Sequence, residues 1–310
     1  MVLSQTLSRA FCAAYAAEQP IRHRLAGIYD LLRYGYVDNA REVLAELKQN
    51  RSGAKRVDWL ERACVGIEMY HRDTSKLADG LENVVVEGLP QPISIRLPTD
   101  VMIFRVPGAR RVLISFGGAN SAFWMPTAFF EFADTHVVAL RDPRRLFHLA
   151  GVKGLGADYA SSVDGLRKLI KGLGVINKVL MVGCSSGGYA ALRYALDLEV
   201  RGVLAISAPT GSELSASELA ELHPGLRKMA QTRPEMMQDL VPLYQRHLNP
   251  PRVIMAWGST NAIDSEQALR MKGLPNVALE PVPGIAMHAS WLKLIADQRF
   301  EPLLARLLAC

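Results

Sequence analysis

The chain has 310 residues, 49% of them hydrophobic and 21% charged, which excludes a mainly disordered protein because ample apolar material is available for a core. Its formal net charge is +6, and residues 91–310 carry the whole excess, because residues 1–90 hold 12 basic and 12 acidic residues. The basic residues are scattered and form no recognisable nucleic-acid module, so we expect no nucleic-acid partner.

The chain contains no run of 18 apolar residues, so no transmembrane segment is expected. Ala-Tyr-Ala at 14–16 resembles a signal-peptide cleavage site, but Arg9 interrupts the apolar run before it, which favours an amphipathic helix. The cysteines lie far apart, without metal-binding or disulfide spacing: Cys12, Cys64, Cys184 and Cys310. We therefore expect reduced thiols, no metal and a cytoplasmic location.

Residues 1–90 are predicted to be a helical region. A helix capped by Asp38 would place Val43, Leu44 and Leu47 on one face. A further helix over 57–73 would place Leu60, Cys64 and Ile67 on one face. Two helices joined by a Gly-containing turn are weakly similar to a tetratricopeptide hairpin, but no second copy follows. We expect a plain helical region that is a candidate for binding a protein partner.

Residues 91–310 are predicted to be an α/β domain. Short β-branched runs there are separated mostly by segments long enough for helices, as at 158–173 and 188–198. Nearly continuous apolar strands joined by helices indicate a mostly parallel sheet covered on both faces, and the first two adjacent runs would form an antiparallel pair. The eight predicted strands are 93–97, 101–106, 110–116, 136–140, 178–182, 202–207, 252–257 and 277–282.

A candidate nucleophile follows the fifth of these strands. The sequence Gly-Cys-Ser-Ser-Gly at 183–187 has the form G-x-S-x-G and stands between a strand and a helix. A nucleophilic serine must stand clear of the sheet on a tight turn, and glycines on both sides allow the strand and helix to approach that turn. We predict that Ser185 is the nucleophile, the alternative being a structural glycine-rich turn.

The partners of such a serine are expected in the order serine, acid, histidine. His288 follows the last predicted strand, where its loop can return an imidazole over Ser185 as general base, and His148 is the nearest rival. Asp264 follows the strand 252–257 and would orient that imidazole, although it could instead cap the helix after it; Glu266 is the fallback.

An oxyanion hole is predicted from backbone amides. One donor would be the amide of Ser186, after the nucleophile, and the second would be the amide of Gly117 or Gly118, after the strand 110–116. Glycines let the backbone turn its amides toward a developing negative charge.

The ordered set of GCSSGG at 183–188, SFGG at 115–118 and GIAMH at 284–288 resembles the nucleophile elbow, oxyanion loop and histidine loop of the α/β-hydrolase superfamily. The resemblance covers residues 93–310 and implies an α/β-hydrolase fold with a serine esterase or acyltransferase activity and no cofactor. The sequence departs from the pattern at Asn261, where many members carry the acid. The superfamily acts on many ester and thioester classes, so the resemblance does not specify a substrate.

Two further segments could bear on the substrate. Arg141, Arg144 and Arg145 follow the strand 136–140 and would suit a carboxylate or phosphate, the alternative being a solvated loop in which Asp142 neutralises one arginine. This Asp-plus-aromatic loop is faintly similar to hydrolase-like proteins of bacterial surface-polysaccharide pathways. Residues 209–250 are expected to form a small helical cap whose apolar residues, Met229, Met236, Met237, Leu240 and Leu243, either line an acyl site or pack the cap itself.

The sequence thus predicts an enzyme that hydrolyses a small-molecule or carbohydrate-linked ester, or a thioester, through an acyl-enzyme on Ser185. One alternative is an O-acyltransferase that moves an acetyl or acyl group from acyl-CoA to a sugar hydroxyl. The other is a non-catalytic binding protein on a hydrolase scaffold.

Overall fold

The computed structural model describes residues 13–14, 20–21, 24–25, 27–28, 31, 37–49, 100–106, 108–118, 134–211, 234–286, 288 and 290–310. The predicted strand 93–97, the predicted helix 57–73, Cys12, Cys64 and residues 212–233 of the predicted cap lie outside the described residues. The chain divides into two compact units: Met1–Arg96 with Pro126–Glu131 and Leu292–Phe300, and Leu97–Met125 with Phe132–Trp291 and Glu301–Cys310.

In the first unit, helix α3 spans Val37–Gln49. The face predicted from the sequence is buried, with Val43, Leu44 and Leu47 no more than 3% exposed. Asp38 lies in the first turn of the helix as its second residue, two positions further in than the capping position predicted for it. Arg24 is buried, and its guanidinium binds both carboxylate oxygens of Glu46 at 2.9 and 2.7 Å, so this unit is also held by a bidentate ion pair.

The second unit is built on a seven-stranded sheet with the order β1-β3-β2-β4-β5-β6-β7. Only β1 runs antiparallel among these strands, and it pairs with β3. The strands are β1 (Val101–Phe104), β2 (Arg111–Phe116), β3 (Thr135–Leu140), β4 (Lys178–Cys184), β5 (Gly202–Ile206), β6 (Arg252–Gly258) and β7 (Val277–Val282). Each falls on a predicted run. Seven of the eight predicted strands are therefore present in the described part of the chain, and the eighth, 93–97, lies outside it.

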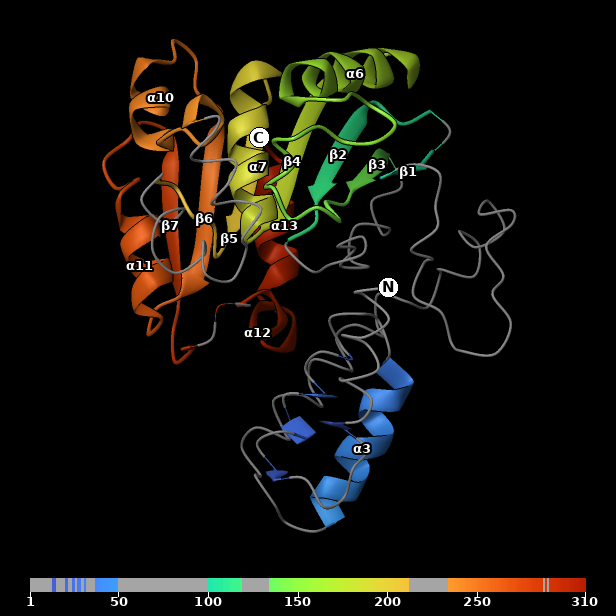
Figure 1. The fold of residues 1–310 in the computed structure, drawn as a ribbon, viewed down its shortest axis with the longest axis vertical. Coiled ribbons are helices and arrows are strands. Elements are labelled where there is room, and N and C mark those ends of the chain that lie inside the picture. The colour runs from blue at the N-terminus through green and yellow to red at the C-terminus, as the bar shows by residue number, and fades with distance from the viewer. Residues whose placement is uncertain are drawn as a thin grey trace. The chain divides into compact units, whose positions relative to one another are not determined.

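Helices cover both faces of this sheet. Figure 1 shows α7 crossing in front of the strands and α13 behind them, as the buried strands of a parallel sheet require. The described helices of this unit are α6 (Tyr159–Gly172), α7 (Ser186–Asp197), η3 (Pro234–Met236), α10 (Leu240–Arg246), α11 (Ala262–Leu269) and α13 (Phe300–Leu308). Helix α12 (Trp291–Ala296) belongs, apart from Trp291, to the first unit.

Strand residues alternate between the two buried layers. In β2, Val112, Ile114 and Phe116 join the core cluster that includes α6, α7 and α10. Leu113 lies between them in sequence, is fully buried and therefore faces the other layer. Because both layers are buried, the central strands contain almost no polar residues, and the candidate catalytic side chains lie at the strand ends.

The described half of the predicted cap is part of this core. Leu240 and Tyr244 of α10 are at most 1% exposed, and the Tyr244 hydroxyl donates to the Leu192 carbonyl of α7 at 3.0 Å. The Tyr189 hydroxyl of α7 likewise donates to the Gln238 carbonyl at 2.8 Å. Met237 is 5% exposed and belongs to the same cluster. Residues 234–246 are therefore packed on α7, whereas the prediction had their apolar side chains lining an acyl site or packing within the cap itself.

Among the described helices, none combines the length and the apolar character needed to cross a membrane.

Candidate active site

The candidate site lies where the chain connections of the sheet change direction. From β2 the chain passes to β3 on one side, and β4 occupies the other side of β2. Crevices in open parallel sheets form at such a point, beyond the carboxyl ends of the two strands. Gly117 and Gly118 follow β2 there, and Ser185 follows β4.

Ser185 is held in a strained turn between β4 and α7. Its φ is +55° and its ψ is −126°, a conformation that non-glycine residues rarely adopt. A Cβ on Gly183 would lie 2.2 Å from the Gly187 carbonyl oxygen, and a Cβ on Gly187 would lie 2.3 Å from the Phe116 carbonyl oxygen. The two glycines are therefore required by close backbone contacts, which press the turn against the end of β2.

Three side chains from separate loops form a continuous hydrogen-bonded series. Nε2 of His288 lies 2.7 Å from Oγ of Ser185, and Nδ1 of His288 lies 2.7 Å from Oδ1 of Asp264. The Asp264 side chain is 3% exposed, whereas that of His288 is 48% exposed. The histidine therefore has a buried carboxylate behind it and an accessible serine in front of it.

Asn261, at the position where many family members carry the acid, and Glu266, the fallback acid, lie elsewhere. Asn261 is the N-cap of α11, and its side-chain oxygen accepts a hydrogen bond from the Asp264 amide at 3.0 Å. Glu266 is exposed. Since Asn261 performs the capping that the sequence also allowed for Asp264, the Asp264 carboxylate is left for His288.

The loop that carries His288 is anchored by hydrogen bonds on both sides of the histidine. The Asn261 side-chain nitrogen donates to the Ala286 carbonyl at 3.1 Å. Beyond the histidine, the hydroxyl of Ser290 lies 2.8 Å from that of Ser207, and both serines are buried. These contacts join the loop to the ends of β5 and β6, so they restrict the position of the imidazole.

The backbone amides near Ser185 differ in their availability. Ser186 is the first residue of α7, and the amide at this position has no acceptor within the helix. The Gly117 amide donates to the Leu140 carbonyl at 2.9 Å, so it is already used in the sheet. Of the two glycines predicted as the second oxyanion donor, this leaves Gly118, where an added Cβ would lie 3.5 Å from Cβ of Ser185.

The loop of residues 141–148, which we call the arginine loop, does not present all three of its arginines to solvent as the sequence predicted. Nε of Arg141 binds Oδ1 of Asp100 at 2.8 Å, and the two side chains are only 7% and 9% exposed, so Arg141 is committed to a buried ion pair. Asp142 accepts hydrogen bonds from the amides of Leu146 and His148, so its carboxylate holds the loop backbone where the sequence suggested an arginine partner. Arg145 is half-buried, with φ +59°.

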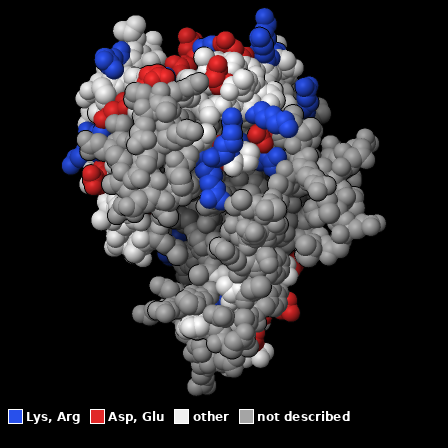
Figure 2. Space-filling model, viewed as in Figure 1, with Lys and Arg blue, Asp and Glu red and all other residues white. Residues whose placement is uncertain are grey.

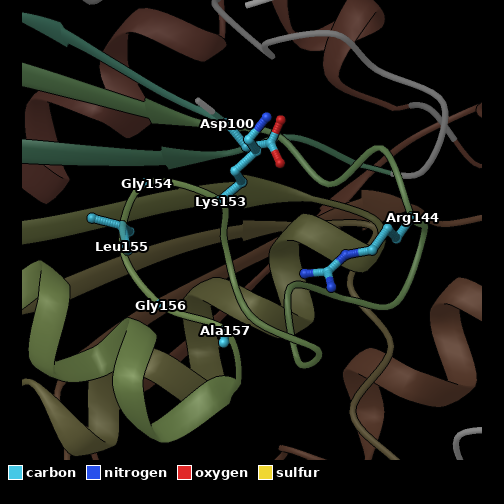
Figure 3. A pocket seen from close by; sticks show the side chains of 7 residues that line it. All are labelled: Asp100, Arg144, Lys153, Gly154, Leu155, Gly156 and Ala157. Carbon is cyan, nitrogen blue, oxygen red and sulfur yellow. The ribbon is translucent and has the colours of Figure 1, made fainter. Parts of the chain in front are cut away.

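Arg144 lines an open pocket of about 760 Å³, and Ser185, His288 and Asp264 are not among its lining residues. Figure 3 shows its guanidinium directed into this pocket, with Lys153 and Asp100 at the top of the view and the backbone of 154–157 running down the side opposite Arg144. Sequence analysis did not predict Asp100 and Lys153 as residues of this pocket, because neither lies in the arginine loop. The one available signal was that Asp100 directly precedes a strand expected to be antiparallel, which can pair with a strand far along the chain. On the face shown in Figure 2, acidic side chains lie between the basic ones over the described residues.

No protein-family model matches the chain, and no curated protein matches its sequence. Among solved structures, the capsule O-acetyltransferase of Neisseria meningitidis serogroup A is 11% identical, with a TM-score of 0.51 over 74% of this chain and 98% of that chain. Est1E from Butyrivibrio proteoclasticus is 14% identical, with a TM-score of 0.50 over 68% and 94%. A variant of the same O-acetyltransferase in complex with CoA is 12% identical, with a TM-score of 0.50 over 67% and 91%. With its mostly parallel sheet and flanking helices, this chain has the α/β-hydrolase fold.

Proposed function

We propose that this protein is a serine hydrolase that cleaves a carboxylic ester or thioester through an acyl-enzyme on Ser185. The observation that carries the proposal is the pair of 2.7 Å contacts that link Ser185 to His288 and His288 to Asp264. A general base must lie within hydrogen-bond reach of the proton that it removes, and its own orientation must be held by a third group. A structural glycine-rich turn would require neither contact.

In the acylation step, Oγ of Ser185 attacks the substrate carbonyl carbon while its proton passes to Nε2 of His288. The buried Asp264 carboxylate holds the proton of Nδ1 and stabilises the imidazolium that results. As the tetrahedral intermediate collapses, the bond to the leaving group breaks and the alcohol or thiol departs with the proton from Nε2. In deacylation, water gives a proton to His288 and attacks the acyl carbon, and Ser185 recovers its proton as the acid is released.

The negative charge on the carbonyl oxygen of the intermediate would be held by the amides of Ser186 and Gly118. Fixed donors of this kind act where charge develops, and removal of one typically costs about 10²–10³-fold in kcat. The engagement of the Gly117 amide by Leu140 assigns the second donor to Gly118 in this proposal.

The proposal is tested with a fluorophosphonate probe and a short-chain p-nitrophenyl ester. We expect a single adduct that maps to Ser185 and is absent in Ser185→Ala, together with ester hydrolysis that falls in that variant by at least about 10³-fold. Ser259→Ala is the matched control, because Ser259 is an exposed serine at the end of β6. Hydrolysis retained in Ser185→Ala would overturn the proposal. A folded wild-type protein that neither reacts nor hydrolyses would favour a non-catalytic binding protein.

A second candidate function keeps the acyl-enzyme but uses acyl-CoA as donor and a sugar hydroxyl as acceptor. The pocket beside Arg144 and Lys153 favours it, because two cationic side chains would suit the phosphates of CoA. Asp100 adds no net charge there, since it is neutralised by Arg141. One structural neighbour was solved with CoA, which supports testing this donor.

The two candidates differ in how they respond to charge removal. If acyl-CoA is the donor, Arg144→Gln and Lys153→Gln raise the KM for acetyl-CoA but leave the hydrolysis of p-nitrophenyl acetate unchanged. Lys168→Gln removes the same charge from an exposed position of α6 as the control. Product analysis with labelled acetyl-CoA and sugar acceptors then shows whether the acyl group goes to a sugar or to water. An unchanged KM for acetyl-CoA in both pocket variants would contradict the role of the pocket.

A further inference from the structure

His148 is a buried histidine that the mechanism above does not use. It is 1% exposed, and its Nε2 lies 2.9 Å from the carbonyl oxygen of Gly117. Its ring meets that of Phe116 edge to face, with centroids 5.2 Å apart. Both contacts are made to the segment that immediately precedes Gly118, the proposed oxyanion donor.

The contact with Gly117 determines the direction of the next amide. A carbonyl oxygen can only accept a hydrogen bond, so Nε2 of His148 carries the proton and donates it. No cis peptide bond occurs in the described chain, and in a trans peptide the C=O and the following N–H point in opposite directions. With the Gly117 carbonyl held by His148, the Gly118 N–H is directed away from the imidazole.

Gly118 lies directly beside the nucleophile. A Cβ on Gly118 would lie 2.9 Å from the Cys184 carbonyl oxygen and 3.5 Å from Cβ of Ser185. The Gly117 carbonyl oxygen also lies close to the backbone of Gly187, since a Cβ added there would come within 2.7 Å of it. Two glycines in succession would otherwise allow this peptide to rotate easily.

The loop that carries His148 holds the histidine in a strained position. Three non-glycine residues there have φ between +58° and +59°: Arg145, Phe147 and His148. Asp142 compensates by accepting the amides of Leu146 at 2.6 Å and His148 at 2.9 Å. The hydroxyl of Tyr194, from α7, donates to the His148 carbonyl at 2.8 Å. Burial raises the pKa of Tyr194, so this hydroxyl is protonated and can donate at neutral pH.

We propose that His148 is a positioning residue that holds the Gly117–Gly118 peptide so that the Gly118 amide faces the oxyanion formed at Ser185. The inference rests on the proposed function, because an oxyanion forms only if Ser185 attacks a carbonyl. His148 acts through the peptide and touches no reacting atom. Its removal therefore weakens binding of the transition state and leaves binding of the substrate ester nearly unchanged.

The test compares three substitutions at this position by steady-state hydrolysis of a p-nitrophenyl ester. His148→Phe keeps an aromatic ring against Phe116 but removes the donor. We expect kcat to fall by at least about 10-fold, up to the 10²–10³-fold cost of losing an oxyanion donor, with KM within about 2-fold. His148→Gln places an amide N–H at about the reach of Nε2 and restores most of kcat. His148→Asn is too short to do so.

A second readout follows the tetrahedral adduct directly. We expect the inhibition constant of a boronic acid, which forms a tetrahedral adduct with Ser185, to rise in His148→Phe and to recover in His148→Gln. The matched control is His247→Phe, because Nε2 of His247 also contacts a backbone carbonyl, that of Leu196 at 3.2 Å, in the last turn of α7 far along the helix from Ser185. Its kcat is expected to stay within about 2-fold of wild type.

The outcomes separate this inference from the proposed function. A wild-type enzyme whose hydrolysis requires Ser185, combined with a normal kcat in His148→Phe, overturns the role of His148 alone. Equal losses in kcat for the Gln and Asn variants also overturn it, and this comparison decides if the Phe variant does not fold. Absence of any hydrolysis that depends on Ser185 overturns the proposed function, and the inference with it.

Discussion

Asn261 and Asp264 divide two tasks at the first turn of α11. The side-chain oxygen of Asn261 accepts the Asp264 amide at 3.0 Å, which caps the helix, and the Asp264 carboxylate binds Nδ1 of His288 at 2.7 Å. An acid at position 264 can therefore serve the histidine without leaving the helix uncapped. With Asn261 as the cap, the carboxylate that contacts His288 comes from three residues further along the chain.

Conversion of Asp264 to Asn should reduce kcat by about 10³–10⁴-fold without a comparable change in KM. The neutral amide cannot stabilise the imidazolium, and an Nδ2–H donor toward Nδ1 would favour the wrong tautomer of His288. Steady-state ester hydrolysis measures the effect, and unfolding curves show whether the variant is folded. Glu266→Gln is the control, since Glu266 is an exposed carboxylate of the same helix. Equal losses in both variants would contradict the assignment of Asp264.

Substitutions of Asn261 should separate capping from positioning. Asn261→Ala removes the cap and should lower the free energy of unfolding by about 1 kcal/mol. Asn261→Asp keeps an acceptor for the cap but loses the donor to the Ala286 carbonyl. We therefore expect Asn261→Asp to retain most of the stability but to show a kcat reduced several-fold, because the histidine loop has lost one of its anchors. Urea denaturation and kinetics on the two variants test this; identical kcat values in Asn261→Asp and wild type would argue against the anchor.

A methyl group on Gly187 should be far more damaging than one on Gly172. At Gly187 the new Cβ would lie 2.3 Å from the Phe116 carbonyl oxygen, a backbone atom that cannot move without displacing β2 from the turn. At Gly172, the last residue of α6, nothing lies within 4 Å. Gly187→Ala should lose several kcal/mol of stability together with most activity, whereas Gly172→Ala should be neutral or stabilising by up to about 1 kcal/mol. Comparable unfolding midpoints for the two variants would refute this difference.

The positions of the strands could be predicted from the sequence because each strand is marked by a local run of apolar residues. Each described strand of the sheet lies on a predicted apolar run, and Ser185, Asp264 and His288, predicted from their places after strands, lie within hydrogen-bond distance in the structure. Strand ends of a parallel sheet share one edge, so chain order alone brings such residues near each other. Their catalytic roles remain predictions.

What the sequence did not reveal depends on contacts between distant segments. From the sequence, Arg141 was predicted to be an exposed cation after a strand. In the structure the antiparallel pairing of β1 with β3 brings Asp100, 41 residues earlier, beside it, so the two form an ion pair. His148 reads as a rival general base, but the positive φ values of its loop turn the ring toward Gly117. Neither a pairing partner nor a left-handed backbone at a non-glycine residue has a reliable local signal.

His136 should make the protein less stable as the pH falls below about 6.5. It is 5% exposed, and burial, aided by the charge of Arg105, lowers its pKa in the folded protein. Its Nδ1 also lies 3.2 Å from the Val106 amide and must be unprotonated to accept that hydrogen bond. Below the ordinary histidine pKa the unfolded chain therefore binds a proton that the folded chain does not, which favours unfolding by up to about 1.4 kcal/mol per pH unit until the folded pKa is reached.

The comparison that isolates this histidine uses His136→Asn, whose side-chain oxygen can still accept the Val106 amide but cannot be protonated. Between pH 7.5 and 5.5 the urea midpoint of the wild type should fall further than that of His136→Asn, whatever the difference between the two proteins at pH 7.5. The extra slope arises only from proton uptake by the unfolded wild-type chain, so it should disappear above about pH 7.5, where both states are neutral at this position. Parallel pH profiles for the two proteins would show that His136 binds protons equally in the folded and unfolded states.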